Sequence, residues 1–180
     1  MNFLTFLFLG DRCYEDKVTQ QILAKVENVT GIPEKNYEFF QLLKYEKGEN
    51  WKILLVCDDE CKLSRHFYRR LDGLYRRHSD YVPGDFQRAQ GVRILTVFIY
   101  LNDMEDEESG GETSFPKLNL KVTPKKGKAV VWPNVYMRNP DARDGRTDHE
   151  ALAVKKGIKF AANLWIHQRD FKTPFYDLCN

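Results

Sequence analysis

Cysteine is scarce in this chain, which argues against a disulfide-rich scaffold. Four cysteines in 180 residues lack the density that such scaffolds use. Cys57, Cys61 and His66 stand at spacings that a zinc site could use, but no fourth ligand follows at a usual spacing. We therefore predict neither a disulfide framework nor a structural zinc site.

The chain also lacks a charge excess and a long hydrophobic run. The 28 basic and 26 acidic side chains leave a net charge of +2, so overall charge favours neither nucleic acid nor an anionic membrane as a partner. The apolar segment MNFLTFLFLG at residues 1–10 is too short to span a bilayer, and it has no basic leader or small-residue cleavage site. With 42% hydrophobic and 13% aromatic residues, the chain has the composition of one globular domain covering residues 1–180.

The spacing of apolar residues predicts an α+β fold. Val18, Ile22, Val26 and Val29 recur at helical spacing, and the run stops at Gly31. Strands are predicted over residues 38–46, 93–101, 118–122, 128–132 and 158–166. Loops are predicted over residues 102–112, 124–127 and 139–145. One helix followed by short strands with turns between them favours a sandwich or jelly-roll core.

The tetrapeptide HSDY contains a possible metal-binding pair. His78 and Asp80 are two positions apart, and such residues point to the same side of a strand. A second histidine would complete a 2-His-1-carboxylate site, which binds Fe(II) and leaves positions open for a co-substrate and oxygen. The third ligand would come from His66, His149 or His167, of which His149 stands where a polar loop becomes a strand. A histidine in a surface loop is the simpler interpretation of His78, because His-x-Asp arises easily by chance.

Several other conspicuous residues allow both a structural and a functional interpretation. Lys159 interrupts the apolar strand IKFAANLWI; it is either an edge-strand lysine facing water or a buried ammonium that needs a carboxylate partner. The glycines of the element Gly110–Thr113 permit a tight turn, and we favour that structural role. Trp132 and Trp165 fit core positions better than a substrate platform.

Five segments in chain order resemble the Fe(II)/2-oxoglutarate-dependent dioxygenases, specifically the catalytic domain of prolyl 4-hydroxylases. They are VTGIPEKNYEFFQLLKYEKGE, HSDY, RILTVFIYLNDMEDEESGGETSFP, VTPKKGKAVVWPN and DHEALAVKKGIKFAANLWIHQRDF, within about Asp11 to Phe171. The combination is far more specific than His-x-Asp alone. The resemblance implies a double-stranded β-helix, or jelly-roll, core with an N-terminal flanking helix.

The resemblance also implies the reaction and its iron ligands. His78, Asp80 and His149 would bind Fe(II). Oxygen would decarboxylate 2-oxoglutarate to succinate and CO2 and hydroxylate a peptidyl residue, with C4 of proline in a peptide or protein as the expected site. L-ascorbate would restore the iron, and the family usually works in the endoplasmic reticulum. The alternatives are the same chemistry on a lysyl or other substrate, and a catalytically inactive relic of the fold.

The same resemblance assigns three residues to 2-oxoglutarate. Lys159 would pair with the distal carboxylate in a desolvated pocket. Thr96 would add a hydroxyl to that carboxylate, and Tyr45 would add a phenol.

The chain departs from the family's pattern in two places. Tyr45 stands 33 residues before His78, and removal of residues 51–74 would restore the family's shorter spacing. This suspected insertion is a tolerated loop, translated intron sequence or a gating segment; we favour intron sequence, and the insertion puts the role of Tyr45 in question. Compared with the family, the chain is also short at its N-terminus.

Overall fold

The computed structural model describes residues 15–47, 52–56, 77–104 and 106–177 of the chain. In these residues, helix α1 (Lys17–Thr30) comes first and helix α2 (Lys172–Asp177) comes last. The strands are β1 (Gln41–Glu46), β2 (Lys52–Val56), β3 (Arg93–Tyr100), β4 (Thr113–Phe115), β5 (Leu120–Val122), β6 (Ala129–Pro133), β7 (Val135–Tyr136), β8 (Asn139–Arg143), β9 (Glu150–Ala151) and β10 (Ile158–His167). Short 3-10 helices occupy Glu34–Asn36, Pro83–Gln87, Glu107–Ser109, Pro116–Leu118 and Gly145–Thr147.

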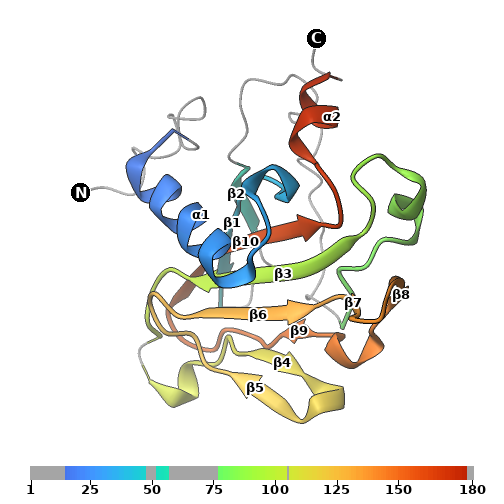
Figure 1. Ribbon diagram of the computed structural model, residues 1–180. Coiled ribbons are helices and arrows are strands. Elements are labelled where there is room, and N and C mark those ends of the chain that lie inside the picture. The colour runs from blue at the N-terminus through green and yellow to red at the C-terminus, as the bar shows by residue number, and fades with distance from the viewer. Residues whose placement is uncertain (1–14, 48–51, 57–76, 105, 178–180) are drawn as a thin grey trace.

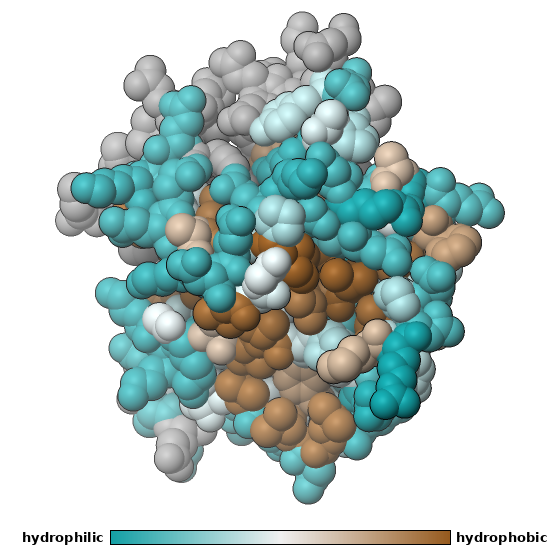
Figure 2. Space-filling model, in the orientation of Figure 1, coloured by the Kyte–Doolittle hydropathy of each residue, from teal (hydrophilic) through white to brown (hydrophobic). Residues whose placement is uncertain are grey.

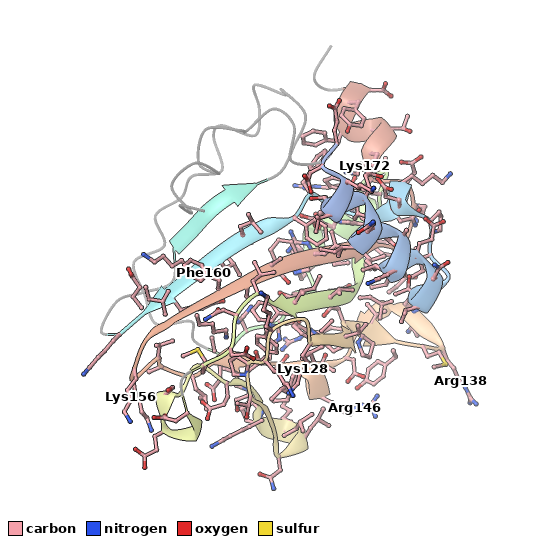
Figure 3. The ribbon with its side chains drawn as sticks, turned by 90° about the vertical axis from the view of Figure 1, so that its left-hand side faces the viewer. Lys128, Arg138, Arg146, Lys156, Phe160 and Lys172 are labelled. Atoms are coloured by element: carbon pink, nitrogen blue, oxygen red, sulfur yellow. The ribbon has the colours of Figure 1, made fainter. Side chains whose placement is uncertain are left out.

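Two antiparallel sheets form the body of the structure. The larger sheet has the strand order β2-β1-β10-β3-β6, and the smaller sheet has the order β5-β4-β9. Figure 1 shows both helices on one side of the larger sheet and the smaller sheet on its other side, and Figure 3 shows β2, β1, β10 and β3 side by side. The prediction of an α+β fold with a jelly-roll core and an N-terminal helix is confirmed.

Helix α1 covers the outer face of the larger sheet. The Asp16 side chain accepts hydrogen bonds from the first turn, and Gly31 ends the helix in a left-handed conformation with φ of +68°. The buried helix residues are Leu23 and Val26. Val18 and Val29, which were expected on the same face, are 61% and 78% exposed, because the stripe that contacts the sheet lies beside them. No helix in the described residues is long and apolar enough to cross a membrane.

Strand β10 separates two apolar clusters. Its outward residues Ala162, Leu164 and Ile166 belong to the cluster under α1. Its inward residue Ala161 belongs to a second cluster between the two sheets, which also contains Phe115 of β4. Because successive side chains of a strand alternate between faces, Lys159 and Asn163 also point into the space between the sheets, whereas a register shift precedes His167.

Some segments differ from the sequence-based expectation. Residues 139–145, predicted as a loop, begin with strand β8, which pairs with β7 in a small hairpin. Within the suspected insertion 51–74, residues 52–56 form β2, an edge strand paired with β1. The rest of that insertion lies outside the described residues, so its origin and the extent of the 1–180 domain stay predictions.

In the described part of the chain, β6 is an edge strand of the larger sheet and β5 an edge strand of the smaller sheet, and both carry exposed apolar side chains. Val131 of β6 is 44% exposed and Leu120 of β5 is 47% exposed. Figure 2 shows apolar residues gathered over the middle and lower part of the face on which these strands lie. A free strand edge with apolar side chains favours association with other polypeptide.

The packing of α1 predicts unequal effects of two truncations. Leu23→Ala removes a fully buried side chain and should lower the free energy of unfolding by about 2–5 kcal/mol. Val29→Ala, on the exposed side of the same helix, should change it by less than about 0.5 kcal/mol. Urea denaturation followed by circular dichroism measures both values. Equal losses would contradict the packing described for the helix.

Candidate metal centre and co-substrate pocket

Three predicted ligands converge in space although they come from distant parts of the chain. His78 and His149 form an isolated antiparallel bridge in which each backbone N–H donates to the other's carbonyl, at 2.9 and 3.0 Å. Asp80 lies two residues after His78, and its carboxylate oxygens lie 3.6 Å from Nε2 of His78 and 3.7 Å from Nε2 of His149. The three candidate ligand atoms all lie within 4.8 Å of one another. This donor set fits a divalent first-row ion such as Fe(II).

The Asp80 carboxylate is held in place from β3. The Thr96 hydroxyl donates to Oδ2 of Asp80 at 2.7 Å and accepts from the Asn134 amide at 2.9 Å. Burial opposes ionisation of Asp80, but the nearby imidazoles of His78 and His149 and the bond from Thr96 outweigh it and lower the pKa to about 2. The carboxylate is therefore ionised and oriented at neutral pH, as a metal ligand must be.

The orientation of the His149 ring suits ligation through Nε2. Its Nδ1 lies 3.1 Å from the Thr147 carbonyl, and a carbonyl can only accept, so Nδ1 carries the proton and the lone pair lies on Nε2. Trp132 and Phe115 flank the ring, with centroids 4.6 and 5.8 Å away. Burial lowers the pKa of His149 despite the charge of Asp80, which keeps the ring neutral near pH 7.

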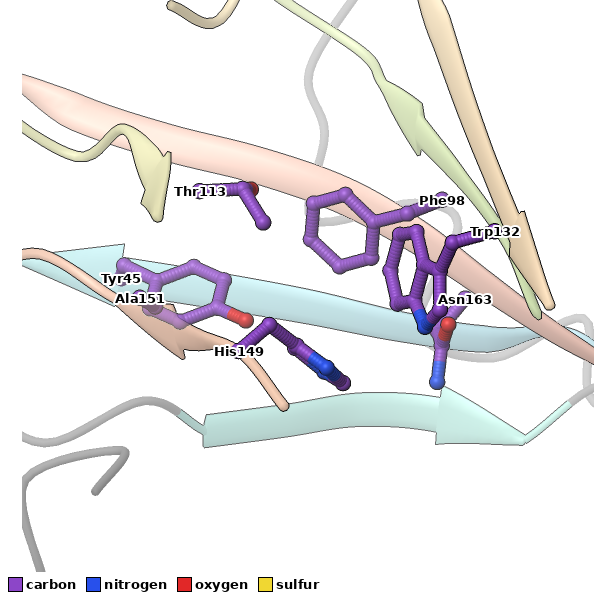
Figure 4. A pocket seen from close by; sticks show the side chains of 7 residues that line it. All are labelled: Tyr45, Phe98, Thr113, Trp132, His149, Ala151 and Asn163. Carbon is purple, nitrogen blue, oxygen red and sulfur yellow. The ribbon is translucent and has the colours of Figure 1, made fainter. Parts of the chain in front are cut away.

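A small pocket adjoins His149. Its lining residues, drawn in Figure 4, are Tyr45, Phe98, Thr113, Trp132, His149, Ala151 and Asn163. Trp132 and Asn163 are both 4% exposed, and Nε1 of the indole and Oδ1 of the amide have no hydrogen-bond partner among the described residues. Buried polar atoms without partners are rare in folded proteins, so these two atoms favour a polar ligand in the pocket.

Lys159 provides a buried cation beside the pocket. The side chain is fully buried, and Nζ donates to the Gly111 carbonyl at 2.7 Å. Nζ lies 4.5 Å from the ring centre of Tyr45, 5.2 Å from Phe98 and 5.5 Å from Tyr100. Among the described residues Lys159 forms no ion pair, and burial lowers its pKa to about 7, although the charge of Glu112 opposes this shift. A buried ammonium that forms no ion pair favours an anionic ligand.

The glycines before β4 give Lys159 its hydrogen-bond acceptor. Gly110 and Gly111 have φ angles of +73° and +79°, and a Cβ on Gly110 would lie 2.3 Å from the Ala153 carbonyl oxygen. The structural role expected for these glycines is thus confirmed, because side chains fit poorly in this turn. The same turn directs the Gly111 carbonyl to Nζ of Lys159.

Of the residues expected to bind the co-substrate, Tyr45 lies at the pocket and Thr96 lies at the metal cluster. Tyr45 lines the pocket and stands opposite Lys159 in the β1–β10 ladder, although 33 residues separate it from His78. Thr96 contacts Asp80, and it is not among the residues that line the pocket. The threonine that does line it is Thr113, which the sequence analysis assigns only to the glycine turn. Strand β4 has three residues, too few for a periodic signal that could have identified Thr113 from the sequence.

Among the described residues, the one further histidine, His167, does not belong to this cluster. His167 is buried at the end of β10, where Nε2 lies 2.7 Å from the Glu38 carboxylate and Nδ1 lies 2.8 Å from the Gly91 carbonyl. Arg93 also pairs with Glu38 and stacks over Trp165 at 3.7 Å. His66 lies outside the described residues. Both tryptophans are buried as expected, and Trp132 in addition lines the pocket.

Comparison with known proteins gives one family and consistent relatives. Residues 62–167 match the model of the 2OG-Fe(II) oxygenase superfamily. The chain is 30% identical to prolyl 4-hydroxylase subunit alpha-2 of Gallus gallus over 158 residues, covering 86% of this chain and 24% of that protein. It is 30% identical to prolyl 4-hydroxylase 5 of Arabidopsis thaliana over 189 residues, covering 93% of this chain and 53% of that protein.

A solved structure is similar in sequence and fold. The viral collagen prolyl hydroxylase of Paramecium Bursaria Chlorella virus-1, in its 2OG complex, has 28% sequence identity and a TM-score of 0.55. The similarity covers 84% of this chain and 69% of that one. By contrast, the chain spans about a quarter of the length of the animal alpha subunits that it matches, 24% for alpha-2 and 26% for alpha-1 of Rattus norvegicus.

The geometry of the cluster predicts the effect of removing one ligand charge. Asp80→Asn should weaken Mn(II) binding more than about 100-fold, since changes to the partners of ligands alone cost roughly 10–100-fold. Asp177→Asn, at an exposed position on α2, should leave the affinity unchanged. Calorimetric titration of both variants with Mn(II) measures the difference. Wild-type affinity in Asp80→Asn would contradict the assignment of Asp80 as a ligand.

Proposed function

Because the chain belongs to the 2OG-Fe(II) oxygenase superfamily, we propose that it hydroxylates a peptidyl residue, namely proline at C4. The reaction depends on Fe(II) and 2-oxoglutarate and releases succinate and CO2. The observation that carries the proposal is the convergence of His78, Asp80 and His149 beside a pocket that adjoins the buried cation Lys159. The names of the relatives, prolyl 4-hydroxylases and a collagen prolyl hydroxylase, support a proline-containing peptide or protein as the substrate.

In this proposal the chain's own residues bind and orient the reactants. Fe(II), held by His78, Asp80 and His149, supplies the activation of oxygen that C–H hydroxylation requires. Lys159 neutralises the distal carboxylate of 2-oxoglutarate, which gives the buried ammonium the counter-ion that the described residues do not provide.

The pocket wall adds polar contacts and excludes water. Tyr45 and Thr113 line the pocket, and the ring centre of Tyr45 lies 4.5 Å from Nζ of Lys159. Phe98 and Trp132 form apolar parts of the same wall, which strengthens the electrostatic contacts of a bound dianion. Thr96 acts on the metal side, because its hydroxyl fixes the Asp80 carboxylate.

Two alternative interpretations of the site have less support than proline hydroxylation. An inactive relic disabled by residues 51–74 is not favoured, because Tyr45 lines the pocket despite that segment and all three candidate ligands converge. A lysyl or other substrate would use the same metal and co-substrate residues, so a peptide panel is needed to separate it from proline. L-ascorbate as the reductant, O2 as the oxidant and the endoplasmic reticulum as the compartment follow from the family resemblance and stay predictions.

Turnover tests the proposed reaction directly. With Fe(II), ascorbate and 2-oxoglutarate, succinate formation should rise on addition of a proline-rich peptide and should not rise with a lysine-rich peptide. Mass spectrometry should find one added oxygen on proline, and Asp80→Asn should form no succinate above background. If only the lysine-rich peptide stimulates succinate formation, the substrate assignment is wrong. If no peptide stimulates succinate formation, and Mn(II) with 2-oxoglutarate also fails to raise the melting temperature, the protein is an inactive relic of the fold and the proposal is wrong.

The lowered pKa of Lys159 predicts a pH dependence for co-substrate binding. In the free protein this pKa is about 7, so the ammonium loses its proton as pH rises above 7. A dianion binds the protonated form, and binding therefore takes up a proton. The affinity for 2-oxoglutarate should fall by about tenfold per pH unit above pH 7.

A lysine-to-arginine variant is the matched control for this pH dependence. Lys159→Arg keeps its charge throughout the range, so its affinity should change much less between pH 7.5 and 8.5, on the order of twofold or less. Anaerobic calorimetry with the Mn(II)-loaded protein measures both affinities. A wild-type affinity that is flat over the same range would rule out titration of Lys159 as the cause.

A further inference from the structure

The β7–β8 hairpin carries exposed apolar side chains to which neither the metal cluster nor the pocket assigns a role. Tyr136 pairs with Asn139, so Met137 and Arg138 form a two-residue turn between the strands. Met137 is 98% exposed and Tyr136 is 44% exposed. Figure 3 shows Arg138 at the outer edge of the molecule. Turns of this length usually consist of glycine, asparagine or aspartate, so turn geometry does not account for a methionine here.

The hairpin is fixed to the metal cluster from two sides. At its base, the Asn134 amide donates to the Thr96 hydroxyl at 2.9 Å, and that hydroxyl donates to the Asp80 carboxylate at 2.7 Å. At its second strand, the Asp141 carbonyl accepts a hydrogen bond of 2.8 Å from the Tyr81 hydroxyl, and Tyr81 directly follows Asp80. These contacts fix the position of the hairpin relative to the candidate ligands.

The hairpin lies at the end of the sandwich where the metal cluster faces solvent. It directly precedes the segment that leads to His149, and Figure 1 places it at the same end of the molecule as residues 77–92, which include the other two candidate ligands. The His78 side chain is 29% exposed, while those of Asp80 and His149 are 4% and 7% exposed. The cluster is therefore reached from the side of His78, next to the segment that contacts β8.

The acidic side chains that follow the hairpin have basic partners within the protein. Asp144 pairs with Arg146, and Asp148 pairs with both Lys117 and Arg143. These ion pairs leave the apolar side chains of the hairpin as its most distinctive feature for a binding partner. An apolar and aromatic surface suits an extended, proline-rich peptide better than a charged one.

We infer that the β7–β8 hairpin, through Met137 and Tyr136, contacts the residues that flank the target proline and so helps to select the peptide substrate. This inference rests on the proposed function. The hairpin residues do not line the co-substrate pocket, so their contacts affect the peptide and not 2-oxoglutarate. A methionine that is merely exposed would affect neither reactant.

Steady-state kinetics on the Fe(II)-loaded full chain separate these two cases. Met137→Ser should raise the KM for a proline-rich peptide about three- to tenfold, the effect of losing one apolar contact. The kcat, the KM for 2-oxoglutarate and the melting temperature should stay unchanged, because an exposed side chain contributes little to the fold. Val29→Ser is the matched control: Val29 is 78% exposed on α1, on the other side of the larger sheet, and its replacement should leave every value unchanged.

A charge introduced at the same position tests for direct contact with the peptide. Met137→Glu should favour a peptide with lysine beside the proline over one with glutamate there, by about threefold or more relative to wild type. Val29→Glu should not change this preference. A wild-type peptide KM in Met137→Ser, or a wild-type preference in Met137→Glu, would overturn the inference. If the wild-type chain shows no peptide-stimulated succinate formation, the proposed function fails first and the inference falls with it.

Discussion

The register of β10 between β1 and β3 is the constraint on which the rest of the site depends. In this register Lys159 stands opposite Tyr45, and Asn163 stands opposite Phe98. A shift by one residue would exchange the two faces of the strand, which would move Lys159 toward α1 and turn Leu164 into the pocket. The outward apolar residues under α1 oppose such a shift. Packing on the face away from the pocket therefore fixes the residues that form the pocket.

The two buried charges of the site, Asp80 and Lys159, differ in how far the protein itself compensates their desolvation. Asp80 is satisfied within the protein, by Thr96 and by the imidazoles beside it. Lys159 has a carbonyl, aromatic rings and no ion pair among the described residues, so part of its desolvation cost stays uncompensated until an anion binds. Stability given up at such a position is available as binding free energy for the co-substrate.

Motif residues and long elements were predictable from the sequence, and short elements were not. The pair His78 and Asp80, the distant His149 and the interrupted strand around Lys159 were recognisable because residue type and order carry the signal. Helix α1 and the long strands β3 and β10 were predictable from the pattern of their apolar residues. Strands of two or three residues, such as β4 and β9, carry no periodicity, and for this reason Thr113 was overlooked. For Thr96 the strand was right, while its contact with Asp80 depends on how a loop folds back onto that strand.

By itself, the sequence determined the chemistry available to this protein: two imidazoles, a carboxylate, a lysine in an apolar strand and the order in which they occur. Only the tertiary structure decided that Thr113 lines the pocket and that the Thr96 hydroxyl orients the carboxylate of Asp80. It also decided that Tyr45, which lies 33 positions before His78 in the sequence, stands opposite Lys159 in the sheet. The physical reason is that side-chain identity is local, whereas strand pairing and packing between two sheets join residues whose separation in sequence sets no distance in space.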